Sequence, residues 1–287
     1  NRSAAEIVSA AIQEDAQGLC VSSYQGGHVE FFRYLMELLR ERGADHIRVF
    51  GGGGGVIVPA EIRQIEAMGA TKIFSPEDGR TLGLQGMINV ILESIDCACE
   101  TSGVAERIDE LTTSNSGLIA RYITAVEEAK ASANGQMVRL IEPLSRRIHR
   151  NIPILGVTGT GGAGKSSLVD ELVVRFTHDF PDKRAAVVSI DPSRRRSGGA
   201  LLGDRIRMNS LRSDRVYMRS LSTRGAQTEI ADALGEVLIV LRAADFDWII
   251  VETAGIGQGD AAIVPHVDVT AYVMTSDYGS PSQLEKI

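Results

Sequence analysis

Apolar residues follow two different spacings in the first third of the chain. Short apolar runs with the length of strands alternate with stretches of helical spacing; the runs are residues 18–22, 47–50 and 71–74. Two of the helices are expected around the stripe of Ile62, Ile65 and Met68, which Gly69 closes, and over residues 83–95. Such alternation predicts a parallel sheet covered on both faces, with ligands at the carboxyl ends of its strands.

The same alternation resumes near residue 151. Strands are expected at residues 154–158, 185–190, 216–221, 247–252 and 268–274. Between them and the first region, strand signals vanish and apolar stripes at 119–126 and 137–144 predict helices. We therefore expect an α/β fold with two parallel-sheet domains, 1–95 and 151–287, joined by a helical linker at 96–150.

The sequence pattern at both ends of the chain is that of a truncated domain. Residue 1 opens directly into a helix without a preceding strand, no initiating Met is present, and the last residues have the pattern of an unfinished helix. We expect a piece of a longer protein, with both domains truncated.

Composition narrows the range of partners. The chain has 287 residues, 44% of them apolar, and a formal net charge of −7, which argues against nucleic acid as a partner. No apolar run approaches the roughly 20 residues that cross a bilayer, so we expect no membrane partner. Three cysteines favour a reducing, cytoplasmic compartment. Cys97 and Cys99 could be half of a metal site, but no second pair lies at ligand spacing.

The strongest motif is residues 159–166, Gly-Thr-Gly-Gly-Ala-Gly-Lys-Ser, between an expected strand and an expected helix. Its glycines let backbone N–H groups surround phosphate oxygens, Lys165 reaches the outer phosphates, and Ser166 offers its hydroxyl to Mg²⁺. The predicted nucleotide-binding residues are Gly159, Gly161, Gly162, Ala163, Gly164, Lys165, Ser166, Ser167, Arg207 and Thr253.

A dinucleotide site is an alternative reading of the same glycines. Gly159, Gly161 and Gly164 also fit the spacing of a nicotinamide or flavin fingerprint, and Asp191 at the end of the next strand could hold a ribose. Such a site does not need Lys165 and Ser166, so the phosphate loop is favoured.

Carboxylates for Mg²⁺ follow later strands. Glu252 ends an apolar strand, where phosphate-loop enzymes place the acid of their second motif. Asp191 and Asp204 could complete the coordination, and Arg207 could neutralise phosphate charge, although a charge-rich loop can also simply face water. The attacking group is a water, for which Gln258 is a weak positioning candidate. No motif that would read guanine follows the phosphate loop.

Together, the phosphate loop and residues 189–208 and 251–260 resemble the G-protein chaperones of cobalamin-dependent acyl-CoA mutases. The first half, with residues 21–24, His28 and residues 50–59, is similar to the flavodoxin-like cobalamin-binding domain of those mutases. The two halves in this order resemble the fused isobutyryl-CoA mutases, in which chaperone and mutase share one polypeptide.

That resemblance implies a Mg²⁺-dependent GTPase, which is a hydrolase. GTP turnover would gate the loading and protection of adenosylcobalamin on a mutase in the same polypeptide. The resemblance also implies that the intact protein is a homodimer. The parent would interconvert isobutyryl-CoA and n-butyryl-CoA as an isomerase. It further implies cofactor contacts at Ser22, Ser23, Gly52 and Gly53, although five glycines at 51–55 could be only a tight turn.

Two departures limit the resemblance. The family's cobalt-binding motif, Asp-x-His-x-x-Gly, is missing from this chain and His28 is not its equivalent, and no mutase barrel is present. Two rivals to the GTPase stay open: a module that binds nucleotide without turnover, and a dinucleotide-dependent oxidoreductase.

Overall fold

The computed structural model describes most of the chain, namely residues 2–24, 26–97, 101–132, 135–191, 205, 208–223, 231–253 and 260–275. The chain divides into two compact units, Asn1–Glu100 and Thr101–Ile287. Each unit has a hydrophobic core of its own, so each is described separately.

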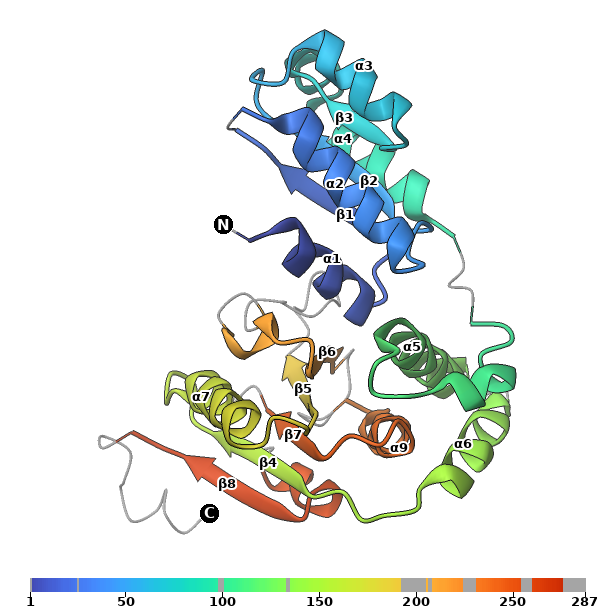
Figure 1. Cartoon of the computed structure of the whole chain (residues 1–287), viewed down its shortest axis with the longest axis vertical. Helices are drawn as coiled ribbons and strands as arrows, with labels where there is room; N and C mark the ends of the chain where they lie inside the picture. Colours follow the sequence, from blue (N-terminus) through green and yellow to red (C-terminus); the bar gives the residue numbers. More distant parts are fainter. Residues whose placement is uncertain are drawn as a thin grey trace. The chain divides into compact units, whose positions relative to one another are not determined.

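The first unit is a three-stranded parallel sheet with helices between its strands (Figure 1). Its elements are α1 (Ala4–Gln13), β1 (Gly18–Ser22), α2 (His28–Glu41), β2 (Arg48–Gly52), α3 (Pro59–Ala67), β3 (Lys72–Phe74) and α4 (Pro76–Ile95). The strands lie in the order β1-β2-β3. All three strand predictions are confirmed within two residues at each end, because apolar runs of strand length between helices specify buried parallel strands.

Helix α4 is longer than expected from the sequence. It begins at Pro76 rather than near residue 83, because Ser75 caps it and accepts from the Asp78 N–H while Asp78 accepts from the Ser75 N–H. Gly83, with φ 64°, interrupts the helix near the position where it was expected to start. The apolar pattern therefore located only the half of the helix beyond this break.

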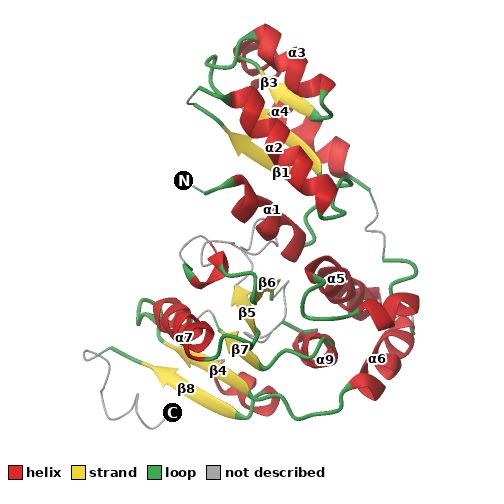
Figure 2. Ribbon diagram, in the orientation of Figure 1, coloured by secondary structure: helices red, strands yellow, loops and turns green. Residues whose placement is uncertain are grey.

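The second unit is a five-stranded, all-parallel sheet with the strand order β6-β5-β7-β4-β8 (Figure 2). Before the sheet come η1 (Ala105–Glu110), α5 (Ser116–Ser132) and α6 (Gln136–Arg147). The sheet region contains β4 (Ile154–Gly159), α7 (Lys165–Asp179), β5 (Ala185–Asp191), η2 (Ser210–Arg212), β6 (Val216–Ser222), α9 (Leu234–Ala243), β7 (Trp248–Glu252), η3 (Asp260–His266) and β8 (Val269–Val273). The five predicted strands are confirmed.

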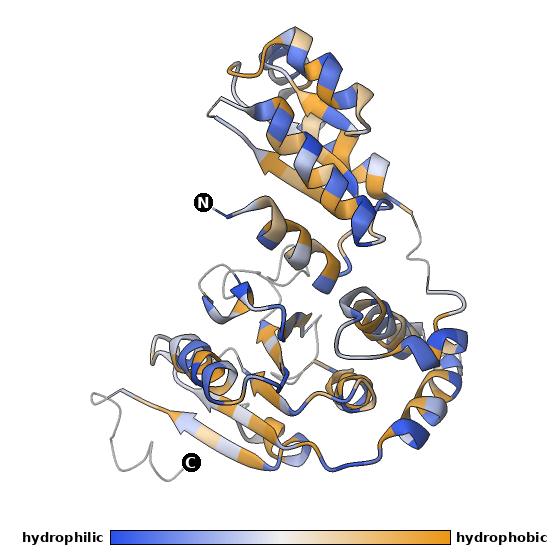
Figure 3. Cartoon of the chain, in the orientation of Figure 1, coloured by the Kyte–Doolittle hydropathy of each residue, from blue (hydrophilic) through white to orange (hydrophobic). Residues whose placement is uncertain are grey.

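Helices cover both faces of this sheet, with α7 on one face and α9 on the other (Figure 1). Alternate residues of a strand supply the two cores: Val187 packs on the α7 side and Val188 on the α9 side. The central strands are apolar on both faces, which explains their continuous apolar runs (Figure 3).

Helices α5 and α6, which the sequence led us to expect as a linker, pack into the second unit. Ile119, Tyr122, Ile123 and Leu144 are fully buried in the same core as α9. Periodicity gave the apolar stripes of these helices but not the surface that covers them. None of the described helices combines the length and hydrophobicity needed to cross a bilayer.

Candidate functional site

The phosphate loop joins the carboxyl end of β4 to the amino end of α7. Gly159 ends the strand with φ 133°, and a Cβ added there would lie 1.9 Å from the carbonyl oxygen of Val273 on β8. Gly162 and Gly164 also have positive φ, 79° and 91°, with open space around them. These glycines therefore have two roles: the first lets two strand ends approach, and the others set the curve of the loop.

Lys165 begins α7 and lies across this loop. Its Nζ donates to the carbonyl oxygens of Gly159 and Thr160, both at 3.0 Å, and only 6% of the residue is exposed. The N-cap of α7 is Gly164, whose missing side chain leaves the first helical N–H groups uncapped by any side chain, and the first turn contains no acid. An ammonium and a helix amino end thus face the same small space, which favours an anion there.

The predicted metal ligands Ser166 and Glu252 meet. The hydroxyl of Ser166, on α7, donates to a carboxylate oxygen of Glu252 at 2.6 Å, and Glu252 is 3% exposed at the end of β7. Two cis ligands of an octahedral Mg²⁺ are about 3.0 Å apart, since each lies about 2.1 Å from the metal. Hard oxygen donors at nearly this separation fit Mg²⁺.

Thr253 follows Glu252 but points between strands. Its Oγ1 donates to Oγ1 of Thr158 on β4 at 2.9 Å, and both side chains are buried. This contact ties the end of β7 to the residue before Gly159. The role of Thr253 at the nucleotide stays a prediction. The buried Thr158 was not predicted, because an isolated Thr in a strand carries no functional signal.

Strand order distinguishes the two readings of the glycines. Strand β7 lies between β4, which leads to the phosphate loop, and β5, which ends at Asp191. A dinucleotide fold places the strand with the ribose-binding acid directly beside the glycine strand. Here Asp191, 7% exposed, is two strands away, roughly 10 Å across the sheet. This arrangement argues against the dinucleotide reading and leaves Asp191 as a predicted Mg²⁺ ligand.

Asp170, which sequence reasoning missed, anchors to α7 the segment that precedes β6. One turn into α7 from Ser166, its carboxylate accepts the N–H groups of Asn209 and Ser210 at 2.9 and 2.8 Å. Burial raises the pKa of this carboxyl, but these hydrogen bonds outweigh burial and hold the pKa below its usual value. An acid inside a helical stripe gave no signal in the sequence, because its partners lie about 40 residues away.

Several predicted residues cannot be placed. Asp204, Arg207 and Gln258 lie outside the described residues, as do Arg194, Arg195 and Arg196. Arg205 is described: it is 8% exposed and its guanidinium donates to the carbonyl oxygen of Met218 on β6 at 3.0 Å. Among the residues with described positions, no three His, Cys, Asp or Glu side chains gather as a metal cluster.

In the first unit, a cavity of about 440 Å³ opens at the carboxyl ends of the strands and includes Ser22, Gly52 and Gly53 in its wall. A Cβ added at Gly53 would lie 2.2 Å from the carbonyl oxygen of Ser23, so only glycine fits at position 53 without a shift of the backbone. The hydroxyl of Ser23 pairs with Nδ1 of His28 at 2.8 Å, and His28 is buried. Three of the four predicted cofactor residues thus line one cavity, and the fourth packs beside it.

Comparisons with known proteins match both halves. Residues 119–286 match the family described as methylmalonyl-CoA mutase-associated GTPase MeaB. The whole chain is 55% identical to the fused isobutyryl-CoA mutase of Geobacillus kaustophilus (strain HTA426), of which it spans 27%. It is 54% identical to the protein of that name from Cupriavidus metallidurans (strain ATCC 43123 / DSM 2839 / NBRC 102507 / CH34), of which it spans 26%. Among solved structures, a LAO/AO transport system kinase matches 66% of this chain and 55% of its own, at 24% identity and a TM-score of 0.48.

Proposed function

The chain belongs to the family of methylmalonyl-CoA mutase-associated GTPases, and on that premise we propose that its second unit binds Mg²⁺-GTP and hydrolyses it. The observation that carries this proposal is the contact of Ser166 with Glu252 at 2.6 Å beside the loop that Lys165 closes. A cation site and an anion site lie side by side there, as a metal-bound triphosphate requires.

In this mechanism a water attacks the γ-phosphorus in line with the bond to the β,γ-bridging oxygen. The new P–O bond forms, the bond to GDP breaks, and the water's proton leaves with the products. Lys165 turns from the loop carbonyls to the outer phosphate oxygens, where its charge stabilises the transition state. Mg²⁺ bound at Ser166 and Glu252, with Asp191 and Asp204 as further predicted ligands, would neutralise phosphate charge. We assign Arg207 a share in that neutralisation.

We further propose that the first unit holds the nucleotide tail of a cobalamin at Ser22, Ser23, Gly52 and Gly53. The cavity at the carboxyl ends of β1 and β2 supports this proposal, since ligands of parallel sheets bind at that edge. In the intact parent, GTP turnover would gate loading and protection of adenosylcobalamin on a fused isobutyryl-CoA mutase. The homodimer and the cytoplasmic location stay predictions.

Phosphate release from the purified chain tests the nucleotide part of the proposal. We expect GTP turnover that needs Mg²⁺, exceeds turnover of ATP, and falls at least about 10²-fold in Lys165→Ala. Lys183→Ala is the matched control, because Lys183 pairs with Asp247, which precedes the amino end of β7, whereas the phosphate loop follows the carboxyl end of β4. Absence of both GTP turnover and GTP binding would contradict the proposal, whereas binding without turnover in the wild-type chain would favour a nucleotide-binding module.

A further inference from the structure

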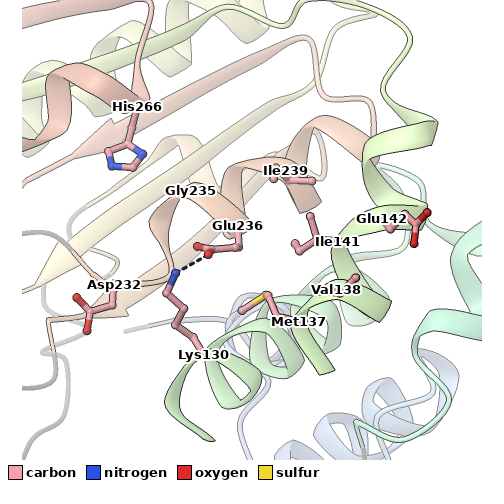
Figure 4. A pocket seen from close by; sticks show the side chains of 10 residues that line it. All are labelled: Lys130, Met137, Val138, Ile141, Glu142, Asp232, Gly235, Glu236, Ile239 and His266. Carbon is pink, nitrogen blue, oxygen red and sulfur yellow. Dashed lines mark hydrogen bonds and ion pairs between the residues drawn. The ribbon is translucent and has the colours of Figure 1, made fainter. Parts of the chain in front are cut away.

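A groove runs along the outer side of α9, between α6 and η3, and it has no part in the nucleotide site. It consists of two adjoining cavities of about 620 and 220 Å³, which share Gly235, Ile239 and His266 as lining residues. Figure 4 shows the larger one, with His266 above Gly235 and Ile141 of α6 next to Ile239 of α9. Cavities of this size accommodate small organic molecules.

The larger cavity has an apolar wall, and three of the charged side chains at its rim are paired, while a fourth, Asp232, also lines it. Met137, Ile141 and Ile239 supply the apolar wall. Lys130 of α5 binds Glu236 of α9 at 2.5 Å (Figure 4). Glu142 binds Arg146 at 2.5 Å. This lobe therefore suits a hydrocarbon chain rather than a charged group.

The guanidinium of Arg242 has one unsatisfied donor beside the smaller cavity. The side chain of Arg242 lines this cavity, and its buried Nε has no hydrogen-bond partner in the part of the chain that the structure describes. Asp268 also lines the cavity, but its carboxylate accepts the Ile154 N–H at 2.8 Å. A buried donor without a partner is costly, so an anion that reaches it gains a charge-assisted bond.

Gly235 leaves the passage between the two lobes open. A Cβ added to this residue would lie 3.7 Å from the ring of His266, in ordinary contact, so no neighbouring group requires glycine there. Gly235 is the second residue of α9, so a side chain there is compatible with the helix. The absence of a side chain on α9 at this point keeps the two lobes continuous beside His266.

From these features we propose that the groove binds a small amphipathic monocarboxylate. Its carboxylate pairs with the Arg242 guanidinium, His266 offers a second donor, and the hydrocarbon chain extends along Ile239 toward Met137 and Ile141. One guanidinium matches one carboxylate in a bidentate pair. The carboxylates of Asp268 and Glu236 in the same groove disfavour a dianionic phosphate. A basic residue in the last turn of a helix also complements the helix dipole, but that role leaves the buried Nε and the cavity unexplained.

Calorimetric titration of the full chain with sodium octanoate tests this proposal, with octan-1-ol and octylamine as probes of equal length. We expect saturable binding of octanoate alone. Arg242→Gln should weaken octanoate at least about tenfold, the loss expected for a hydrogen bond to a charged group. Arg175→Gln on α7 removes the same charge from an exposed pair and should leave the affinity unchanged.

Gly235→Leu provides a second variant that favours the helix while filling the passage with an isobutyl group. We expect it to abolish octanoate binding while the unfolding midpoint stays equal or rises. The proposal is overturned if octanoate does not bind, if octan-1-ol binds as well as octanoate, or if both groove variants bind octanoate like the wild type. None of these results depends on GTP turnover, so failure here is distinguishable from failure of the GTPase proposal.

Discussion

Asp170 is a carboxylate whose charge is stabilised by the segment that precedes β6. It accepts three hydrogen bonds, from the Asn209 N–H, the Asn209 amide and the Ser210 N–H, at 2.9, 3.2 and 2.8 Å. We expect Asp170→Asn to lower the free energy of unfolding by about 1 kcal/mol at pH 7, because the amide loses the charge that strengthens these bonds. Urea unfolding followed by tryptophan fluorescence measures this difference.

The pH dependence of that difference has a defined sign. The folded pKa of Asp170 lies below its ordinary value of about 3.9, so its stabilising effect is complete above that pH. As the pH falls through the folded pKa, the effect is lost and wild type and variant should converge. Asp179→Asn, at the exposed end of the same helix, is the control and should be neutral throughout. A difference that stays constant down to pH 3 would contradict this account.

Residues that act as neighbours in the sequence were the predictable ones. Lys165 and Ser166 carry a signature because the loop and the helix start that position them are contiguous. Glu252 could be predicted because an acid at the end of an apolar strand is conspicuous, and the structure brings it to Ser166. The contacts of Asp170 could not, because its partners come from a distant element, which the spacing of residues along the chain does not encode.

Helix α5 is attached to the second sheet by a buried ion pair. Arg219 of β6 donates to Glu127 at 3.0 Å and to Oγ1 of Thr124 at 3.1 Å, and the Arg219 and Glu127 side chains are 7% and 16% exposed. We expect Glu127→Gln to destabilise the second unit by about 3 kcal/mol, since it removes a carboxylate charge that pairs with the buried guanidinium of Arg219. The adjacent and exposed Glu128→Gln should cost less than about 0.5 kcal/mol.

A double variant separates the charge effect from the packing effect. Arg219→Met combined with Glu127→Leu replaces the pair by apolar groups and should recover most of the lost stability, because neither charge then needs a partner. Chemical unfolding of the wild type, Arg219→Met, Glu127→Leu and the double variant gives the coupling energy. If Glu127→Gln is as stable as Glu128→Gln, the pair does not attach the helix.

Strands were easier to predict than the surroundings of helices. The runs at 185–190 and 247–252 are apolar on both faces, which only a buried parallel strand requires, and the structure places them at β5 and β7. The stripes of α5 and α6 showed that one face is buried but not which surface covers it, so a linker and a packed layer have the same sequence pattern.

At the scale of the whole chain, we expect two unfolding transitions, because the two units have separate cores. Trp248, the only tryptophan, lies in β7 against Phe176, so fluorescence follows the second unit alone while far-ultraviolet circular dichroism follows both. Mg²⁺-GTP at 100 times its Kd should stabilise only the transition seen by fluorescence, by about 2.7 kcal/mol.

Lys165→Ala is the control for this experiment and should lose the nucleotide effect without merging the transitions. Coincident unfolding curves from the two signals would show one cooperative unit and contradict the prediction. The sequence predicted a division because a long stretch without strands separates two βα regions. It did not predict the boundary near residue 100, since that boundary depends on where α5 packs.

The close approach of Gly159 to Val273 sets a limit on which amino acids the phosphate loop can accept over many generations. With φ 133° and a carbonyl oxygen 1.9 Å from the place of a Cβ, position 159 admits one residue type of the twenty. At positions 162 and 164, with φ of 79° and 91° and no neighbouring atom in the way, Asn costs the fold less than any side chain at position 159 does. A library of all single substitutions, scored for folding, should therefore show the strictest intolerance where the loop meets β8.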